Sequence, residues 1–213
     1  MVDSDTNERP AGLGDPARLI ALADGVFAIV MTLLVLELQL PAGLSEEELY
    51  RELIHHLPSL LAYVFAFLLA GEYWIYHRHI FNGVRGTTLT VVVFNIGFLL
   101  LVALIPFGAS LIGNYPQSRA ALFLYGVLLT LLEGYRLIMS LYITRKPGVF
   151  LSPWAAMMRR RVQVMVVAVC VFAASLALVP FLPPLVILLV YGITPLGFFL
   201  AMGWLSRRVT GTA

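Results

Sequence analysis

The amino-acid sequence predicts an all-α integral membrane protein with six transmembrane helices per subunit. Of its 213 residues, 60% are hydrophobic and 12% are charged, whereas about a quarter of the residues are charged in soluble domains. The mean hydropathy is +0.90. Apolar windows of about 20 residues, the length of a membrane-crossing helix, occur near residues 18–38, 56–77, 89–112, 120–142, 162–180 and 185–205.

The first span, residues 18–38, is predicted to have two different faces. At about 100° per residue, one face is an apolar stripe formed by Leu22, Gly25, Ile29, Leu33 and Leu36. Asp24 points in roughly the opposite direction. A carboxylate inside a membrane helix is costly unless it faces protein or water, so Asp24 indicates a functional site with a partner on another helix.

The connection after the first span is predicted to hold a short surface helix. It begins after Ser45, whose side chain can cap a helix. Four glutamates make this outer side acidic, namely Glu46, Glu47, Glu48 and Glu52.

Prolines indicate kinks and helix starts in the later spans. Pro106 in the third span and Pro195 in the sixth predict kinks, which membrane helices tolerate. Ser152 followed by Pro153 has the order of residues that starts a helix. The single cysteine, Cys170, excludes an intrachain disulfide and is predicted to be a small core residue.

The distribution of positive charge predicts the orientation. With the N-terminus inside, the external loops keep only Arg51 and Arg119. The positive-inside rule then places both termini in the cytoplasm of a multi-pass protein of the plasma membrane. The run Arg159–Arg161 is interpreted as part of this pattern, so no nucleic-acid partner is expected.

Polar residues of the first three spans are predicted to form a layer near the inner surface, consisting of Arg18, Asp24, Trp74, His77 and Asn95. Each has donors or acceptors that need partners in a bilayer. The layer is interpreted as a latch that fixes the first helix, as a proton-sensitive element through His77, or as packing contacts without a role in gating. Arg18 lies on a different helix face from Asp24, so a pair between them requires another subunit or helix.

Two further acids, Glu72 and Glu133, lie inside predicted spans. Glu133 has Arg136 one helical turn away, which predicts a local ion pair, whereas Glu72 has no evident partner. No nucleophile motif, metal motif or glycine-rich phosphate loop accompanies them, so no enzyme and no cofactor are expected. His77 and His79 are two positions apart and do not share a helix face, so no metal site is predicted.

The first span resembles the signature of a known family. Arg18, residues 22–29 (LADGVFAI) and the run from Thr32 to Pro41 are similar to the first helix of the bacterial relatives of transmembrane protein 175, the endolysosomal potassium channel. In that signature an arginine and a spacer precede Phe-Ser-Asp. Leu22 and Ala23 stand here in place of the Phe-Ser pair, so any hydrogen bond made by that serine is absent.

The motif Trp74-x-x-His77, Asn95 and the pair Pro106-Phe107 also resemble the family, and the resemblance is strongest over residues 18–107. It implies a homotetramer of six-helix subunits around a central pore lined by the first helix. Such a pore is permeable to potassium and is constricted by apolar side chains. In agreement, the chain has no TVGYG-like run of the kind that forms a carbonyl filter.

The resemblance also implies roles for residues of the first span. Ile29 becomes the main constriction, with Leu33 and Leu36 as the next layers outward, while Thr32, Gly25 and Leu22 flank the pore. Glu37 lies beside the stripe near the external mouth. Together with Glu46–Glu48 it is expected to concentrate cations there, or else to form part of a solvated acidic loop.

The leading prediction is therefore a potassium-permeable cation channel. The channel domain spans residues 18–205, between a disordered cytoplasmic arm (1–17) and a short cytoplasmic tail (206–213). Its expected partners are other copies of the chain, monovalent cations and the lipid bilayer. The alternatives are a proton-conducting channel and a proton-coupled secondary transporter that uses Asp24 and His77, although transporters usually have internal repeats and broken helices, which this sequence lacks.

Overall fold

The computed structural model describes residues 14–145, 152–195 and 197, and every regular element in this part of the chain is a helix. The predicted all-α fold is confirmed. In chain order the helices are α1 (Pro16–Val35), α2 (Glu46–His55), α3 (Leu57–Asn82), α4 (Leu89–Val102), α5 (Ile105–Asn114), α6 (Arg119–Arg145) and α7 (Ser152–Leu178), followed by a short helix, Pro184–Pro195.

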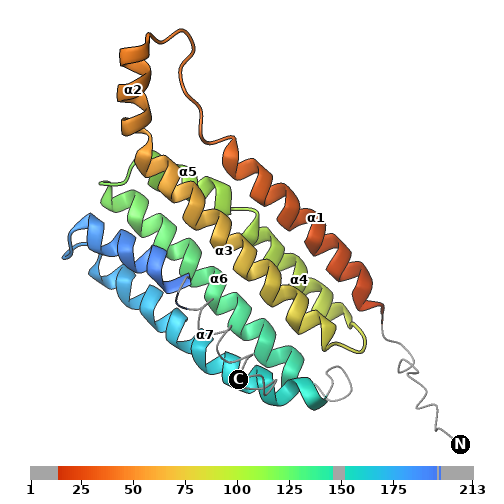
Figure 1. Ribbon diagram of the computed structural model, residues 1–213. Coiled ribbons are helices and arrows are strands. Elements are labelled where there is room, and N and C mark those ends of the chain that lie inside the picture. The colour runs from red at the N-terminus through yellow and green to blue at the C-terminus, as the bar shows by residue number, and fades with distance from the viewer. Residues whose placement is uncertain (1–13, 146–151, 196, 198–213) are drawn as a thin grey trace, which may run out of the picture.

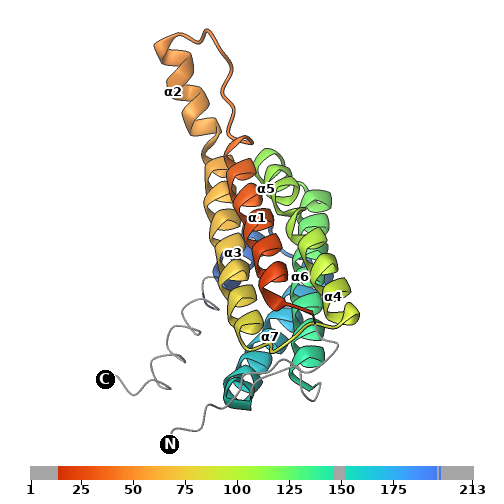
Figure 2. The ribbon, with the colours of Figure 1, turned by 90° about the vertical axis from the view of Figure 1, so that its right-hand side faces the viewer.

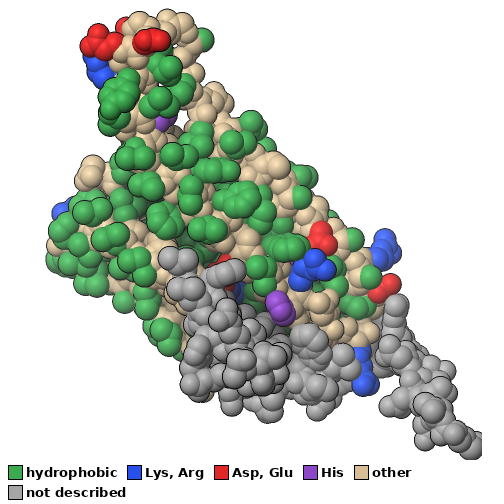
Figure 3. Space-filling model, in the orientation of Figure 1, with side chains coloured by type: hydrophobic (Ala, Val, Ile, Leu, Met, Phe, Trp, Pro, Cys, Tyr) green, Lys and Arg blue, Asp and Glu red, His purple; other side chains and the backbone are tan. Residues whose placement is uncertain are grey.

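The helices of the first four predicted spans are long and apolar enough to cross a membrane. The stretches that are long and apolar enough to cross a membrane are Pro16–Val35, Leu57–Asn82, Leu89–Asn114 and Arg119–Arg145. Within the described residues, the fifth and sixth predicted spans fall on shorter apolar helices, Val162–Leu178 and Pro184–Pro195. Apolar side chains cover the middle of the visible face, and charged side chains gather mainly towards the two ends (Figure 3). A bilayer requires this distribution because charge is costly at its centre.

The helices run side by side in an elongated bundle, and α2 projects beyond one end of it (Figures 1 and 2). Helix α1 packs against α3, α4 and α5, whereas α6 packs against α4, α5 and α7. Helices α1 and α7 consequently lie at opposite edges of the bundle (Figure 1).

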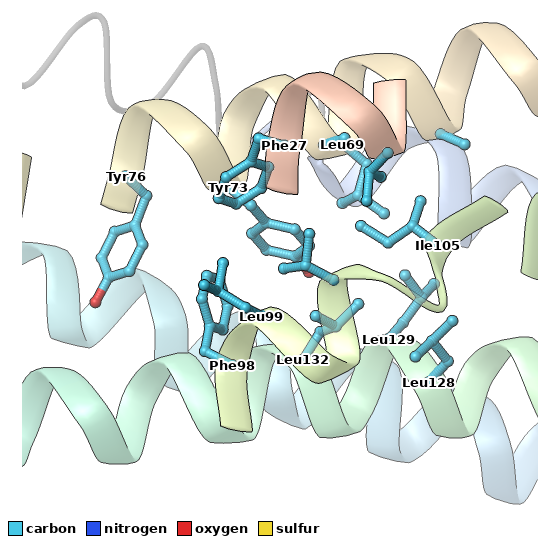
Figure 4. Packing of buried hydrophobic residues seen from close by; sticks show 14 of the residues in the cluster. Phe27, Leu69, Tyr73, Tyr76, Phe98, Leu99, Ile105, Leu128, Leu129 and Leu132 are labelled. Atoms are coloured by element: carbon cyan, nitrogen blue, oxygen red, sulfur yellow. The ribbon is translucent and has the colours of Figure 1, made fainter. Parts of the chain in front are cut away.

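Large side chains from several helices fill the core. Figure 4 shows Phe27 of α1 close to Tyr73 of α3, with Phe98 of α4 and Leu132 of α6 nearby. The buried residues of α1 recur every three or four positions, as one helix face requires: Leu19, Ala23, Phe27, Val30 and Leu34. Because lipid tails are as apolar as leucine, van der Waals packing holds such a face in a membrane, rather than the exclusion of water.

Helix α2 begins as predicted. The Ser45 hydroxyl accepts a hydrogen bond from the Glu48 amide at 3.4 Å, and the Glu48 carboxylate accepts one from the Ser45 amide at 2.9 Å. This reciprocal capping box satisfies amides that the first helical turn leaves unpaired. Hydrogen bonds from the Ser45 hydroxyl and amide favour the ionised carboxylate and hold the pKa of Glu48 below its usual value.

The third predicted span is broken between α4 and α5. Pro106 lies in the first turn of α5, where its missing N–H costs no hydrogen bond. At the predicted kink the helix is interrupted at Ala103 and Leu104, both of which keep right-handed helical dihedral angles. Helix α7 begins at Ser152, also as predicted. Pro195 is the last residue of the continuous described stretch of its helix, so the kink predicted there stays a prediction. Cys170 is exposed, and the prediction that it is a core residue was wrong.

The segment that leads into α1 is folded. Gly14 and Thr87 exchange two backbone hydrogen bonds, of 2.9 and 3.0 Å, which join the segment just before α1 to the loop between α3 and α4. Asp15 then caps α1 by accepting from the Ala17 amide at 3.0 Å. Residues 14–17, assigned by the sequence to a disordered arm, therefore belong to the folded bundle. Residues 1–13 of that arm and the predicted tail 206–213 lie outside the described residues.

Candidate functional site in the first helix and the polar contacts behind it

The predicted apolar stripe lies on the face of α1 that turns away from the bundle. Ile29 is 60% exposed and Leu36 is 58% exposed, whereas Val30, one position from Ile29, is 2% exposed. The other members of the stripe, Leu22, Gly25 and Leu33, are exposed as well. An apolar face of this kind has no neighbour among the described residues of the subunit, so a second subunit, lipid or a pore must cover it.

The two polar residues predicted beside the stripe have different surroundings. Thr32 is exposed, and its hydroxyl donates to the carbonyl oxygens of Ala28 at 3.1 Å and Ile29 at 2.9 Å. This local bonding lets a hydroxyl remain in an apolar helix. Glu37 follows the end of α1 and is exposed. It borders a small cavity that also includes Tyr63 and Asn114.

The predicted inner polar layer forms two separate pairs. The Trp74 indole of α3 donates to the Asp24 carboxylate of α1 at 2.7 Å, and His77 Nε2 lies 2.6 Å from the Asn95 side-chain oxygen on α4. No hydrogen bond between described residues joins the two pairs. Arg18 is exposed and has no ion-pair partner in the described part of the chain. The structure therefore brings together four of the five predicted members, in two pairs.

His77 is enclosed by aromatic rings, which limits its chemistry. Its ring stacks on Phe81 with a centroid distance of 4.3 Å and lies nearly parallel to Phe98 at 6.3 Å. Asn95 Oδ1 accepts from the Nε2–H tautomer, while Nδ1 is buried with no hydrogen-bond partner among the described residues. A second proton on Nδ1 would find no acceptor there. This geometry favours a neutral, structural histidine over the proton-sensitive element considered from the sequence.

We expect removal of the Asp24 carboxylate to weaken the attachment of α1 to α3. In Asp24→Ala the half-buried Trp74 indole loses its acceptor, which costs about 1–3 kcal/mol. Thermal unfolding of the purified protein in detergent should show a lower midpoint. Asp24→Asn keeps an acceptor oxygen and should lose less stability. Unchanged stability in Asp24→Ala would show that water, not Asp24, satisfies the indole.

A further group of charges, only partly predicted, lies between α3 and α6. Arg136 Nη2 is 2.5 Å from Glu133 Oε2, which confirms the predicted local pair. Arg136 Nη1 is also 2.5 Å from Glu72 Oε1, so Glu72 has the partner that sequence reasoning missed. The signal was present: Glu72 and Arg136 are both charges inside apolar spans, and each is costly alone.

Aromatic and hydroxyl groups complete this cluster. The Arg136 guanidinium lies 5.1 Å from the Tyr73 ring centroid and 5.0 Å from that of Tyr76, within the range of cation–π attraction. The Tyr73 hydroxyl donates to Glu133 Oε1 at 3.0 Å. Ser140 hydrogen-bonds both the Tyr76 hydroxyl and the Arg136 carbonyl oxygen.

One group of side chains outside the bundle has the chemistry of metal ligands. Glu52, His55 and His56 place their ligand atoms within 4.8 Å of one another at the end of α2, and histidine nitrogens with a carboxylate oxygen are typical ligands of zinc. Sequence reasoning considered only His77 and His79. His79 instead bonds the Ile75 carbonyl oxygen of its own helix at 2.7 Å.

Comparisons with known proteins point to one family. Residues 18–106 match the family described as the endosomal/lysosomal potassium channel TMEM175. A potassium channel of Chryseobacterium sp. is 36% identical over 110 residues, which cover 52% of this chain and 55% of that protein. A potassium channel of Streptomyces collinus is 31% identical over 109 residues, covering 51% of this chain and 53% of that protein.

Human TMEM175, named as an endosomal/lysosomal proton channel, is 25% identical over 221 residues, which cover 98% of this chain and 42% of the human protein. The chain thus spans about half the length, or less, of these curated relatives. The fold resembles a crystal structure described as that of a lysosomal potassium-selective channel TMEM175 homologue from Chamaesiphon minutus. The TM-score is 0.76 at 24% identity, over 88% of this chain and 97% of the other.

The family match covers the part of the chain that holds the exposed stripe and both polar pairs. It begins at Arg18 and ends at Pro106, at the start of α5. These are also the residues on which the sequence resemblance rested. The resemblance is confirmed over these residues, in which the chain is similar to the TMEM175 family.

Proposed function

We propose that the chain is the subunit of a potassium-permeable cation channel, in which four copies surround a pore lined by the exposed face of α1. The observation that carries the proposal is the contrast between Ile29, 60% exposed, and Val30, 2% exposed. An apolar stripe on α1 faces outward while the opposite face is anchored in the bundle. Bacterial relatives named as potassium channels support the same reading.

The chemistry of such a pore follows from its lining. A ring of Ile29 side chains offers a passing ion no ligands, so permeation requires the ring to be wide enough to stay hydrated, and a narrow ring closes by dewetting. Partial dehydration is easier for potassium than for the smaller, more strongly hydrated sodium ion. A modest preference for potassium therefore needs no carbonyl filter.

The proposed subunit crosses the membrane six times, with both termini in the cytoplasm of the cell. The two shorter apolar helices, Val162–Leu178 and Pro184–Pro195, would supply the fifth and sixth crossings. Helix α2, with its exposed Glu46 and Glu47, would then lie outside the cell. The scarcity of positive charge on the external loops supports this orientation.

Proton conduction is the second candidate. Two relatives, from human and zebrafish, are named as proton channels. Asp24 is half-buried on the helix that carries the exposed stripe, and a carboxylate there is a group on which a proton can reside. Conduction of protons through the same pore would require no change in the architecture proposed above.

Reversal potentials of the purified protein in liposomes test both candidates. Under separate potassium, sodium and proton gradients, we expect potassium to dominate, with measurable sodium permeability. Flux carried by protons alone would favour the second candidate, and absence of flux under every gradient would refute the channel. Mass photometry of the active preparation should find four chains, and an active species of one or two chains would refute the tetramer.

Neutralising Glu37 should lower the conductance chiefly at low ionic strength. Four exposed carboxylates at the outer mouth would concentrate cations by a field that salt screens within about 10 Å at 0.1 M. Conductance of Glu37→Gln should be compared with wild type across a salt series. Glu47→Gln tests whether the acidic residues of α2 share this role, since it removes the same charge from a residue paired with Arg51 at 2.8 Å. A deficit independent of salt would argue against electrostatic attraction.

A further inference from the structure

The charged cluster between α3 and α6 contains more acid than base. Glu72, Glu133 and Arg136 are 5%, 2% and 0% exposed, and all three lie on helices long and apolar enough to cross the membrane. If both carboxyl groups were ionised, one guanidinium would face two negative charges. The cluster would then hold an uncompensated charge inside the bilayer, which costs several kcal/mol.

Within the described part of the chain, the surroundings of the cluster supply no second cation. From α3 the cluster faces the hydroxyls of Tyr73 and Tyr76, and from α6 that of Ser140. Phe98 of α4 and Met165 of α7 approach it with an aromatic ring and a thioether. Among the described side chains, no lysine, histidine or other arginine pairs with either carboxyl group.

The hydrogen bonds distinguish the two carboxyl groups. Both oxygens of Glu133 accept, one from Arg136 and one from the Tyr73 hydroxyl. Of the two oxygens of Glu72, Oε1 accepts, also from Arg136, while Oε2 is buried without a hydrogen-bond partner among the described residues. An ionised carboxylate carries charge on both oxygens and needs donors at both. Glu133 therefore has the surroundings of an anion. At Glu72 a neutral O–H without an acceptor costs less in an apolar interior than a charged oxygen without a donor, so Glu72 has the surroundings of a neutral acid.

We propose that Glu72 is a buried proton-binding site, at which Oε2 carries one proton while Glu133 is the anion that balances Arg136. With this proton the cluster has one positive charge, one negative charge and no net charge. Loss of the proton from Oε2 to water would leave the cluster with a net charge of minus one. The site lies between α3 and α6, apart from the exposed stripe of α1, so it does not depend on the proposed pore.

A proton bound to Glu72 makes the stability of the folded chain depend on pH. At neutral pH an unfolded chain has ionised glutamates, so unfolding releases the proton held by Glu72. Stability must then fall as the pH rises. The pH dependence can be measured by SDS-induced unfolding from mixed micelles. The unfolding equilibrium constant of the wild type should increase with pH, by up to tenfold per pH unit more than the constant of Glu72→Gln. Equal slopes in the two proteins would overturn the proposal.

Infrared spectroscopy of the full chain in liposomes detects the proton directly. At neutral pH the wild type should show the carbonyl stretching band of a protonated carboxyl group. The band should persist in Asp24→Asn and disappear in Glu72→Gln, which should fold normally because its amide reproduces a neutral acid. A wild type without the band, its persistence in Glu72→Gln, or failure of that variant to fold would each contradict the proposal.

Glu133→Gln is the variant matched to Glu72→Gln, because it neutralises the other carboxyl group that contacts Arg136. Here Glu72 remains as the sole counter-ion of Arg136 and must ionise, so the acid band should also vanish. The charge then rests on a carboxyl group whose second oxygen lacks a donor, and Glu133→Gln should be less stable than Glu72→Gln. Equal stability of the two variants would show that the cluster does not distinguish its carboxyl groups.

Discussion

Arg136→Met is expected to lose about 3–5 kcal/mol of folding free energy, the usual cost of removing one partner from a buried ion pair. The guanidinium is fully buried and contacts Glu72 and Glu133 at 2.5 Å each. Without it, Glu133 must either stay charged in an apolar interior or take up a proton. Denaturant midpoints in mixed micelles, together with the fraction of protein that remains monodisperse after solubilisation, measure the loss.

Two comparisons separate charge from packing in this experiment. Adding Glu133→Gln to Arg136→Met removes the stranded carboxylate and should restore part of the lost stability, since well-packed neutral groups often replace buried ion pairs without loss. Arg145→Met, at the exposed end of the same helix, should be close to wild type. If the double variant were no more stable than Arg136→Met alone, the loss would come from the missing contacts with Tyr73 and Tyr76.

Ile29→Asn is expected to raise the current and weaken the discrimination between potassium and sodium. Ile29 is largely exposed on α1, so the amide should not disturb the subunit, and it would supply a polar group at the proposed constriction. Wetting of that layer lowers the barrier for every cation and reduces the dehydration step on which selectivity depends. Recordings under bi-ionic potassium and sodium conditions measure both effects.

Val30→Asn is the matched control, one position along the same helix. Val30 is buried, so its replacement places an amide in the bundle core at a cost of about 1–3 kcal/mol. Fewer channels should form, with unchanged selectivity in those that do. If Ile29→Asn left current and selectivity unchanged, the exposed stripe of α1 would not line the pore.

Features that depend on spacing along one helix were predictable from the sequence. The two faces of α1 follow from a period of about 3.6 residues, and the Glu133–Arg136 pair follows from a separation of three positions. The helix cap at Ser45 and the kink at Pro106 depend on a few adjacent residues. In each case neighbouring backbone atoms determine the geometry, and the structure agrees.

Contacts between helices were not predictable in the same way. Counting residues from the membrane surface gives the depth of Asp24, Trp74, His77 and Asn95, but not the rotation of each helix about its axis. The depth therefore suggested one layer, whereas rotation places them in two pairs. Glu72 and Arg136 are 64 positions apart, and only the tertiary arrangement of the bundle brings them together.

The backbone bridge between Gly14 and Thr87 restricts how α1 can move. A β-carbon on residue 14 would lie 2.7 Å from the Thr87 hydroxyl, so the close approach depends on glycine. Sliding α1 along its axis would break both hydrogen bonds or drag the loop between α3 and α4 with it. At the other end, residues 36–45 form no regular helix before α2, and Gly43 adopts a positive φ of 79°. Helix α1 is thus held by hydrogen bonds at its N-terminal end and followed by a non-helical segment at its C-terminal end. This arrangement permits α1 to tilt about Gly14 more readily than to translate along its axis.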